Sequence, residues 1–210
     1  MPEPSGSIRS GRSGPTTGPA AMGGVVIIIL VIIGLIAVVV IGYIVIYNSL
    51  ARLVVGVDAA WAQVQVQLKR RSDLIGNLVE TVKGYASHER ETLQAVTDAR
   101  AAVSSASGPA EAAGASNMLT QAVGRLFAVA EAYPDLKASA GFTQLQTELA
   151  GTEDRIAYAR QYYNQSVASL NTRRVTFPGN IVAGNRPRFA AREFFEAPEA
   201  DTQAPQVSFD

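Results

Sequence analysis

The sequence predicts an all-α protein in which an N-terminal transmembrane helix is followed by a long antiparallel helical bundle. Two observations lead to this fold class. An uncharged apolar run covers residues 25–46, and behind it apolar residues recur three and four positions apart, the spacing that one face of a helix requires. No segment alternates apolar and polar residues for long enough to indicate a strand.

The apolar run is long enough to cross a bilayer. As a helix, its roughly 22 residues span about 33 Å, which matches the hydrocarbon core. A cleaved signal peptide is the alternative, because small residues at 49–51 suit signal peptidase. The run exceeds the roughly 7 to 15 apolar residues of a secretory signal, which favours an uncleaved anchor over residues 25–47. We therefore expect a single-pass protein of the cell membrane that contacts the lipid bilayer through this segment.

Few basic residues flank the span. Arg9 and Arg12 precede it, Arg52 follows closely, and residues 69–71 add three more charges at a distance. Because cytoplasmic flanks carry the excess of Lys and Arg, the balance favours, by a small margin of charge, a cytoplasmic amino terminus and an extracytoplasmic bundle.

The composition excludes several functional classes. The chain has 18 basic and 18 acidic residues in 210, so it lacks the basic excess that binding to nucleic acid requires. It contains no Cys, which removes disulfides, thiolate metal sites and cysteine nucleophiles.

The chain is expected to divide into five parts. Residues 1–24 and 197–210 are rich in Pro, Gly and polar residues and poor in apolar ones, which predicts a disordered leader and a disordered tail. The membrane span occupies 25–47 and the bundle 48–178. Residues 179–196 form an aromatic segment that is expected to pack on the bundle.

Three helical segments make up the predicted bundle. The first has an apolar stripe from Trp61 to Val103, and because no Pro lies between residues 22 and 108, it could continue the membrane span as one rod as far as Ser105. A second helix is expected over residues 109–132. The third carries a stripe from Phe142 to Leu170 and closes at residues 177–178.

Charged residues gather in "QLKRRSDLIGNLVETVKGYASHERETL", residues 67–93, which raises the question of an active site. On a helix, Lys69 with Asp73 and Glu80 with Lys83 have the spacing of ordinary surface ion pairs. His88 and Glu89 could begin a zinc-protease motif, but Thr92 stands where the second His would be, and the chain has no other His. The pattern indicates a solvated helix face.

No catalytic, cofactor-binding or metal-binding residue is predicted, and no cofactor is expected. The carboxylates of Glu148, Glu153 and Asp154 have the spacing of a solvated face. Two polar residues lie near the stripe, Arg71 and Asn77. Each could be a buried device that fixes helix register or could reach around to solvent.

The chain resembles the LemA family through several long motifs. These are "YNSL" (47–50), "AWAQVQVQLKRRSDLIGNLVETVKGYASHE" (60–89), "EAYPDLKASAGFTQLQTEL" (131–149), "TEDRIAYARQYYN" (152–164) and "FP" (177–178). The resemblance implies an N-terminal anchor, a bundle of about four long helices and no established biochemical activity, with some relatives in bacterial magnetosome membranes. The family usually has Pro where this chain has Gly76, which puts in doubt a kink that the resemblance would otherwise imply.

These observations favour a membrane-anchored scaffold that is not an enzyme and binds a protein partner or itself. One alternative is a membrane-shaping or lipid-binding protein that contacts lipid through Phe189, Phe194 and Phe195, although these rings could instead cap the bundle. Another is an enzyme or enzyme subunit that uses the charged face formed by Arg70, Asp73, Asn77 and Glu80.

Trp61 is expected to be a packing anchor, because small residues flank it on the helix. Two antiparallel turns should bring its partners from the third helix or the segment behind it, near Leu170 and Phe177. The alternative is a Trp that sits among lipid headgroups.

Overall fold

The computed structural model describes residues 19–196, and every regular element in this range is a helix. The all-α class is therefore confirmed. In chain order the elements are α1 (Pro19–Lys83), α2 (Arg90–Ser105), α3 (Pro109–Glu131), α4 (Pro134–Lys137), α5 (Ala140–Val175), α6 (Gly179–Ala183) and the 3-10 turn η1 (Pro187–Phe189).

The chain divides into two units at Ile46. The first contains the apolar part of α1, whose side chains are exposed from residue 23 to 41 and which is long and apolar enough to cross a membrane. The helix begins at Pro19, inside the leader that the sequence analysis expects to be disordered. The rest of that leader and the expected disordered tail at 197–210 lie outside the described residues.

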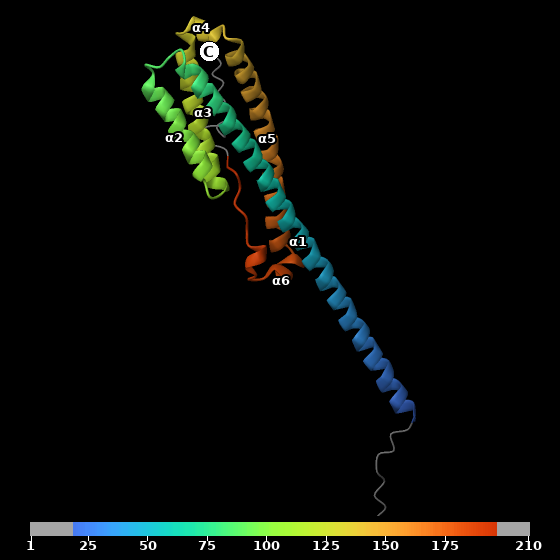
Figure 1. Cartoon of the computed structure of the whole chain (residues 1–210). Coiled ribbons are helices and arrows are strands. Elements are labelled where there is room, and N and C mark those ends of the chain that lie inside the picture. Colours follow the sequence, from blue (N-terminus) through green and yellow to red (C-terminus); the bar gives the residue numbers. More distant parts are fainter. Residues whose placement is uncertain (1–18, 197–210) are drawn as a thin grey trace, which may run out of the picture. The chain divides into compact units, whose positions relative to one another are not determined.

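The second unit is the bundle. Its long helices are α2, α3, α5 and the part of α1 that begins at Ile46, as the resemblance implied (Figure 1). Pro109 begins α3 at the position where a missing N–H costs no hydrogen bond. The α2 and α3 helices pack closely because small residues such as Ala99 and Ala122 line the contact between them.

The predicted rod to Ser105 is wrong. The first helix is continuous from the apolar run into the bundle, but it ends at Lys83, and residues 84–89 form turns before α2 begins. Gly84 and Ser87 have low helix propensity, and folding back lets α2 bury Leu93 and Val96. Tyr85, which the predicted stripe from Trp61 to Val103 includes, is 49% exposed.

Two apolar clusters form the core of the bundle. The cluster that contains Leu50 joins the α1 residues up to Leu68 to α5, α6 and the C-terminal rings Phe189 and Phe195. The other is built around Leu78 and unites the end of α1 with α2, α3, α4 and the start of α5. Arg71 and Ser72, both buried, lie on α1 between these two clusters.

Candidate functional site

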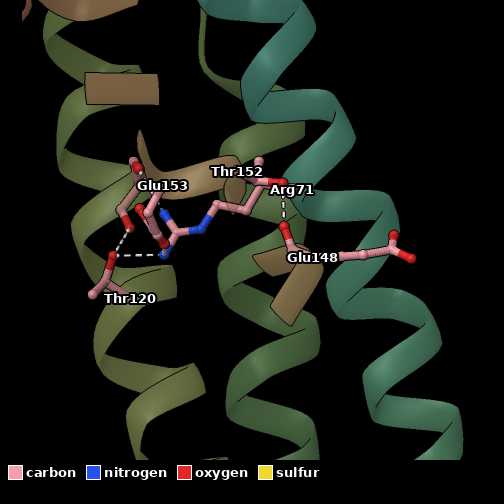
Figure 2. Close-up of polar contacts among 6 residues, drawn as sticks. Arg71, Thr120, Glu148, Thr152 and Glu153 are labelled. Carbon is pink, nitrogen blue, oxygen red and sulfur yellow. Dashed lines mark hydrogen bonds and ion pairs between the residues drawn. The ribbon is translucent and has the colours of Figure 1, made fainter. Parts of the chain in front are cut away.

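A buried arginine joins three helices of the bundle. Arg71 on α1 is only 3% exposed. Its Nη1 donates to Ser116 Oγ at 3.1 Å and its Nη2 to Thr120 Oγ1 at 2.9 Å, both on α3. The same Nη2 forms an ion pair with Glu153 on α5, and Figure 2 shows the Arg71 side chain together with Thr120 and Glu153. The structure thus decides for the buried alternative at Arg71.

The guanidinium of Arg71 is buried, and burial disfavours its charged form. Burial lowers its pKa from the ordinary value, and the nearby carboxylate of Glu153 opposes this shift. Glu153 itself is 48% exposed, so water reaches one side of the pair. Among the buried polar atoms, Arg71 Nε has no hydrogen-bond partner. The neighbouring groups therefore satisfy only part of the hydrogen-bonding capacity of the guanidinium.

The chemistry of this cluster is that of a structural node. Thr120 Oγ1 donates to the backbone carbonyl of Ser116 at 3.0 Å, so its proton is already committed. Thr152, buried beside it, donates in the same way to the carbonyl of Glu148 at 2.8 Å (Figure 2). An arginine cannot serve as a base at neutral pH. One guanidinium thus links α1 to α3 and α5.

The other polar candidates lie on the surface. Lys69 pairs with Asp73 at 2.8 Å, and Lys83 with Glu80 at 3.9 Å, which confirms the predicted surface pairs. Asn77 is exposed, so its solvent-facing alternative holds. The four residues of the face considered for an enzyme, Arg70, Asp73, Asn77 and Glu80, are all exposed on α1.

The two residues considered for zinc, His88 and Glu89, do not gather with the carboxylates of α5 into one site. His88 is exposed in the turn after α1, and Glu89 accepts a hydrogen bond from the Tyr133 hydroxyl at 3.2 Å. Glu148 accepts from Gln144 at 2.9 Å. Within residues 19–196, no three His, Asp or Glu side chains lie close enough to hold a metal ion.

Trp61 packs against α5, as expected, but on different residues. Its ring centroid lies 5.4 Å from that of Tyr163 and 6.3 Å from that of Phe195. Leu170 belongs to the same apolar cluster, whereas Phe177 is 77% exposed. The predicted helix is thus correct, and the predicted contact with Phe177 is wrong.

The C-terminal segment, residues 190–196, is held along α5 by two asparagines. The Asn164 amide donates to the Phe195 carbonyl and accepts from the Phe195 N–H, both at 2.9 Å. Asn171 forms the same pair with Arg192, and the Tyr163 hydroxyl donates to the Glu193 carbonyl at 2.7 Å. The backbone of this extended segment is thus hydrogen-bonded by side chains of α5, as it would be by a neighbouring strand.

Two of the three phenylalanine rings near the C-terminal end of the described chain, Phe189 and Phe195, face the protein. Phe189 and Phe195 are 1% and 2% exposed, and Arg160 lies over the Phe195 ring at 5.1 Å. These two rings cap the bundle and cannot contact lipid, so that part of the lipid-binding alternative is wrong. Only Phe194 remains accessible. Sequence reasoning missed Asn164 and Asn171, whose seven-residue spacing on one helix face was the available signal.

A hollow of about 390 Å³ opens beside Trp61. The indole is half-buried, and Leu68, Val103 and Ala112 form the apolar part of the wall. Gln65, Lys69 and Asp73 supply a polar edge. The site therefore combines an accessible aromatic ring with an apolar floor and a polar rim.

The fold and these contacts define an all-helical bundle preceded by an apolar helix that is long enough to cross a membrane. A family model described as the LemA family matches residues 60–209, and the chain belongs to this family.

Named relatives extend the comparison. The chain is 26% identical over 189 residues to the magnetosome protein MamQ of Magnetospirillum gryphiswaldense, which covers 77% of this chain and 70% of that protein. It is 28% identical to magnetosome protein MamQ 2 of Paramagnetospirillum magneticum, over 74% of this chain and 67% of the relative. Protein LemA of Metamycoplasma hominis is 31% identical, over 65% of this chain and 63% of that protein.

Proposed function

We propose that this chain is a membrane-anchored helical scaffold that binds a protein partner or a second copy of itself and catalyses no reaction. The apolar part of α1 supplies the anchor in the cell membrane, and the bundle supplies the binding surface. The relatives are named as magnetosome proteins or as LemA, and those names describe no reaction. A scaffold role for this chain agrees with them.

The hollow beside Trp61 carries this proposal. Tryptophan is among the residues that contribute most to protein interfaces when it sits in an apolar pocket with a polar rim. Trp61 is supported from behind by Tyr163 and Phe195, so the ring is already held in place before a partner arrives. A preordered anchor lowers the entropic cost of association.

Site-specific photocrosslinking in living cells tests the proposal. A photoreactive amino acid at Gln65, on the edge of the hollow, is expected to capture a partner or a second copy, which mass spectrometry of the purified adduct identifies. The matched control is Gln161, another exposed glutamine, which lies on α5 away from the hollow. Equal labelling at both positions, or none at Gln65, would contradict a binding site at Trp61.

The proposal also includes an orientation, with the bundle on the extracytoplasmic side. Because the chain has no Cys, a single Cys at Gln161 can be labelled without background. A membrane-impermeant maleimide should label this position in intact cells. Labelling only after lysis would place the bundle in the cytoplasm.

A further inference from the structure

An apolar corner lies where α5 meets α6. Three large apolar side chains are exposed there within seven residues, Val175 at 62%, Phe177 at 77% and Ile181 at 66%. The next residues along α6, Val182 and Ala183, are buried in the core of the bundle. The corner is thus fixed from the inside while its outer surface offers apolar groups to the surroundings.

The segment around this corner is strongly basic. No Asp or Glu occurs from residue 155 to 192, although the whole chain has no net charge. Four of its arginines, Arg173, Arg174, Arg186 and Arg188, lie within seven residues of the corner in sequence and are exposed or half-exposed, whereas Arg192 is paired with Asp58. The arginines of this segment are Arg155, Arg160, Arg173, Arg174, Arg186, Arg188 and Arg192.

Contacts within the bundle place this basic segment beside the first bundle turn of α1. Arg188 Nη1 donates to the Tyr47 hydroxyl at 3.2 Å. The Phe189 ring meets that of Tyr47 edge-on, with centroids 5.3 Å apart. Tyr47 follows the apolar run directly in sequence, so if that run spans a bilayer, covalent connection alone keeps Tyr47 near the headgroups. Figure 1 shows α6 next to the same part of α1.

We propose that the corner formed by Val175, Phe177 and Ile181, together with its arginines, docks on the anionic phospholipid headgroups of the bilayer that α1 crosses. Apolar side chains flanked by basic ones are the combination that binds a bilayer interface, through burial of the former and attraction of the latter. This surface is distinct from the hollow at Trp61 and from the buried rings of the C-terminal segment, and it goes beyond the scaffold function.

Charge argues for lipid over a second copy as the occupant. In a two-fold contact between copies the same patch meets itself. The arginines around the corner would then face one another, and such like-charge contacts oppose association. An anionic headgroup layer provides the opposite charge instead. The surface also adjoins the residue at which the predicted span ends.

The test uses the full chain reconstituted in vesicles. Phe177→Cys is labelled with an environment-sensitive fluorophore, and lipids that carry a doxyl quencher report contact with the bilayer. Tyr158→Cys is the matched control, because Tyr158 is an aromatic residue on α5 that is 73% exposed. It precedes Val175 by about 25 Å along the helix. Ile181→Cys serves as a second probe of the corner.

In vesicles of phosphatidylcholine with phosphatidylglycerol, probes at 177 and 181 should show blue-shifted emission and quenching by doxyl lipid, and the probe at 158 neither. Quenching at the corner should be lost without phosphatidylglycerol or at about 1 M salt, where the screening length falls to about 3 Å. Equal weak quenching at all three positions would overturn the proposal. Blue-shifted emission at position 177 without quenching by doxyl lipid would also overturn it, since protein would then cover the corner. Quenching that ignores lipid charge and salt would reject the electrostatic docking proposed.

Discussion

Asn171 and Arg192 form a reciprocal pair in which a side-chain amide takes the place of a neighbouring strand. The Asn171 amide donates to the Arg192 carbonyl at 2.9 Å, and the Arg192 N–H donates back at 3.0 Å. The pair between Asn164 and Phe195 repeats this pattern. Seven residues of helix rise about 10.5 Å, and three extended residues span about 10 Å. This match lets α5 hold residues 190–196 antiparallel to itself.

Replacing Asn164 with Ala should free the end of the C-terminal segment. The Phe195 N–H and carbonyl would both lose their partner, at a cost of about 1–3 kcal/mol. Hydrogen exchange of the peptide that covers residues 190–196 should accelerate, while exchange in α2 should stay unchanged. Asn164→Asp is the matched variant, because it keeps the acceptor for the Phe195 N–H and should have a smaller effect. Unchanged exchange in Asn164→Ala would show that other contacts hold the segment.

The ion pair between Arg71 and Glu153 predicts an asymmetry between its two partners. Glu153→Ala would leave the buried guanidinium without a counter-charge, whereas Arg71→Met removes the charge and keeps an apolar side chain of similar length. We expect Glu153→Ala to cost about 1–3 kcal/mol, a value reduced from that of a fully buried pair because Glu153 is half-exposed, and Arg71→Met to cost less than about 1.5 kcal/mol.

Thermal unfolding of the detergent-solubilised chain, followed by circular dichroism, measures both variants. The double variant should melt no lower than Glu153→Ala alone, because the orphaned charge is then gone. The control is Asp154→Ala, which removes an exposed carboxylate from the adjoining position of α5. If Arg71→Met were the more harmful change, the guanidinium would stabilise the bundle beyond neutralising Glu153.

Two glycines should respond in opposite directions to alanine. A Cβ at Gly76 would meet the guanidinium of Arg100, whose Nη2 lies 2.8 Å away, and that group ends a flexible side chain that can move. A Cβ at Gly179 would collide with the backbone carbonyl of Arg173, which cannot. Alanine gains about 1 kcal/mol over glycine inside a helix. Gly76→Ala should therefore keep or raise the melting temperature, and Gly179→Ala should lower it. An equal fall in melting temperature for both variants would show that the Arg100 side chain is as fixed as the backbone.

The turn after Lys83 and the partners of Trp61 show how much of the fold the sequence could predict. The helical character of the chain and most of its buried stripe followed from spacing, because burial of an apolar face is periodic along the chain. The turn after Lys83 did not, since no Pro marks it and α2 is stabilised by packing against α3, which spacing along a single helix does not reveal. The partners of Trp61 were placed on the right helix, but their register depends on the lengths of turns that sequence spacing does not determine.

The candidate site was less accessible to sequence reasoning. The role of Arg71 stayed undecided because a long side chain can leave a stripe position for solvent, and its acceptors Ser116 and Thr120 lie on another helix. The asparagine pairs at α5 were missed for a similar reason. They require a non-helical segment to lie alongside a helix, and the seven-residue spacing of the two asparagines marks one helix face without indicating which segment that face holds.

The last prediction concerns the pH at which the Tyr163 hydroxyl ionises. Burial raises the pKa of Tyr163 above the ordinary 10.0, and Arg192 opposes that shift while Glu193 and Asp58 add to it. A raised pKa means that the fold favours the protonated form. The stabilisation is therefore fully present below the unfolded pKa and is lost as the pH rises through the raised folded pKa. Docking of residues 190–196 should weaken over that alkaline window, since a tyrosinate cannot donate to the Glu193 carbonyl.

Trp61 provides the readout, because its ring lies 5.4 Å from that of Tyr163 and a tyrosinate so close should quench indole fluorescence. The midpoint of this quenching should lie above pH 10.0, the ordinary tyrosine value. In Tyr163→Phe the transition should disappear, while Tyr158→Phe, which changes an exposed tyrosine on the same helix, should leave it in place. A midpoint at or below the ordinary value would mean that solvent reaches the Tyr163 hydroxyl and that the C-terminal segment does not stay closed over it in solution.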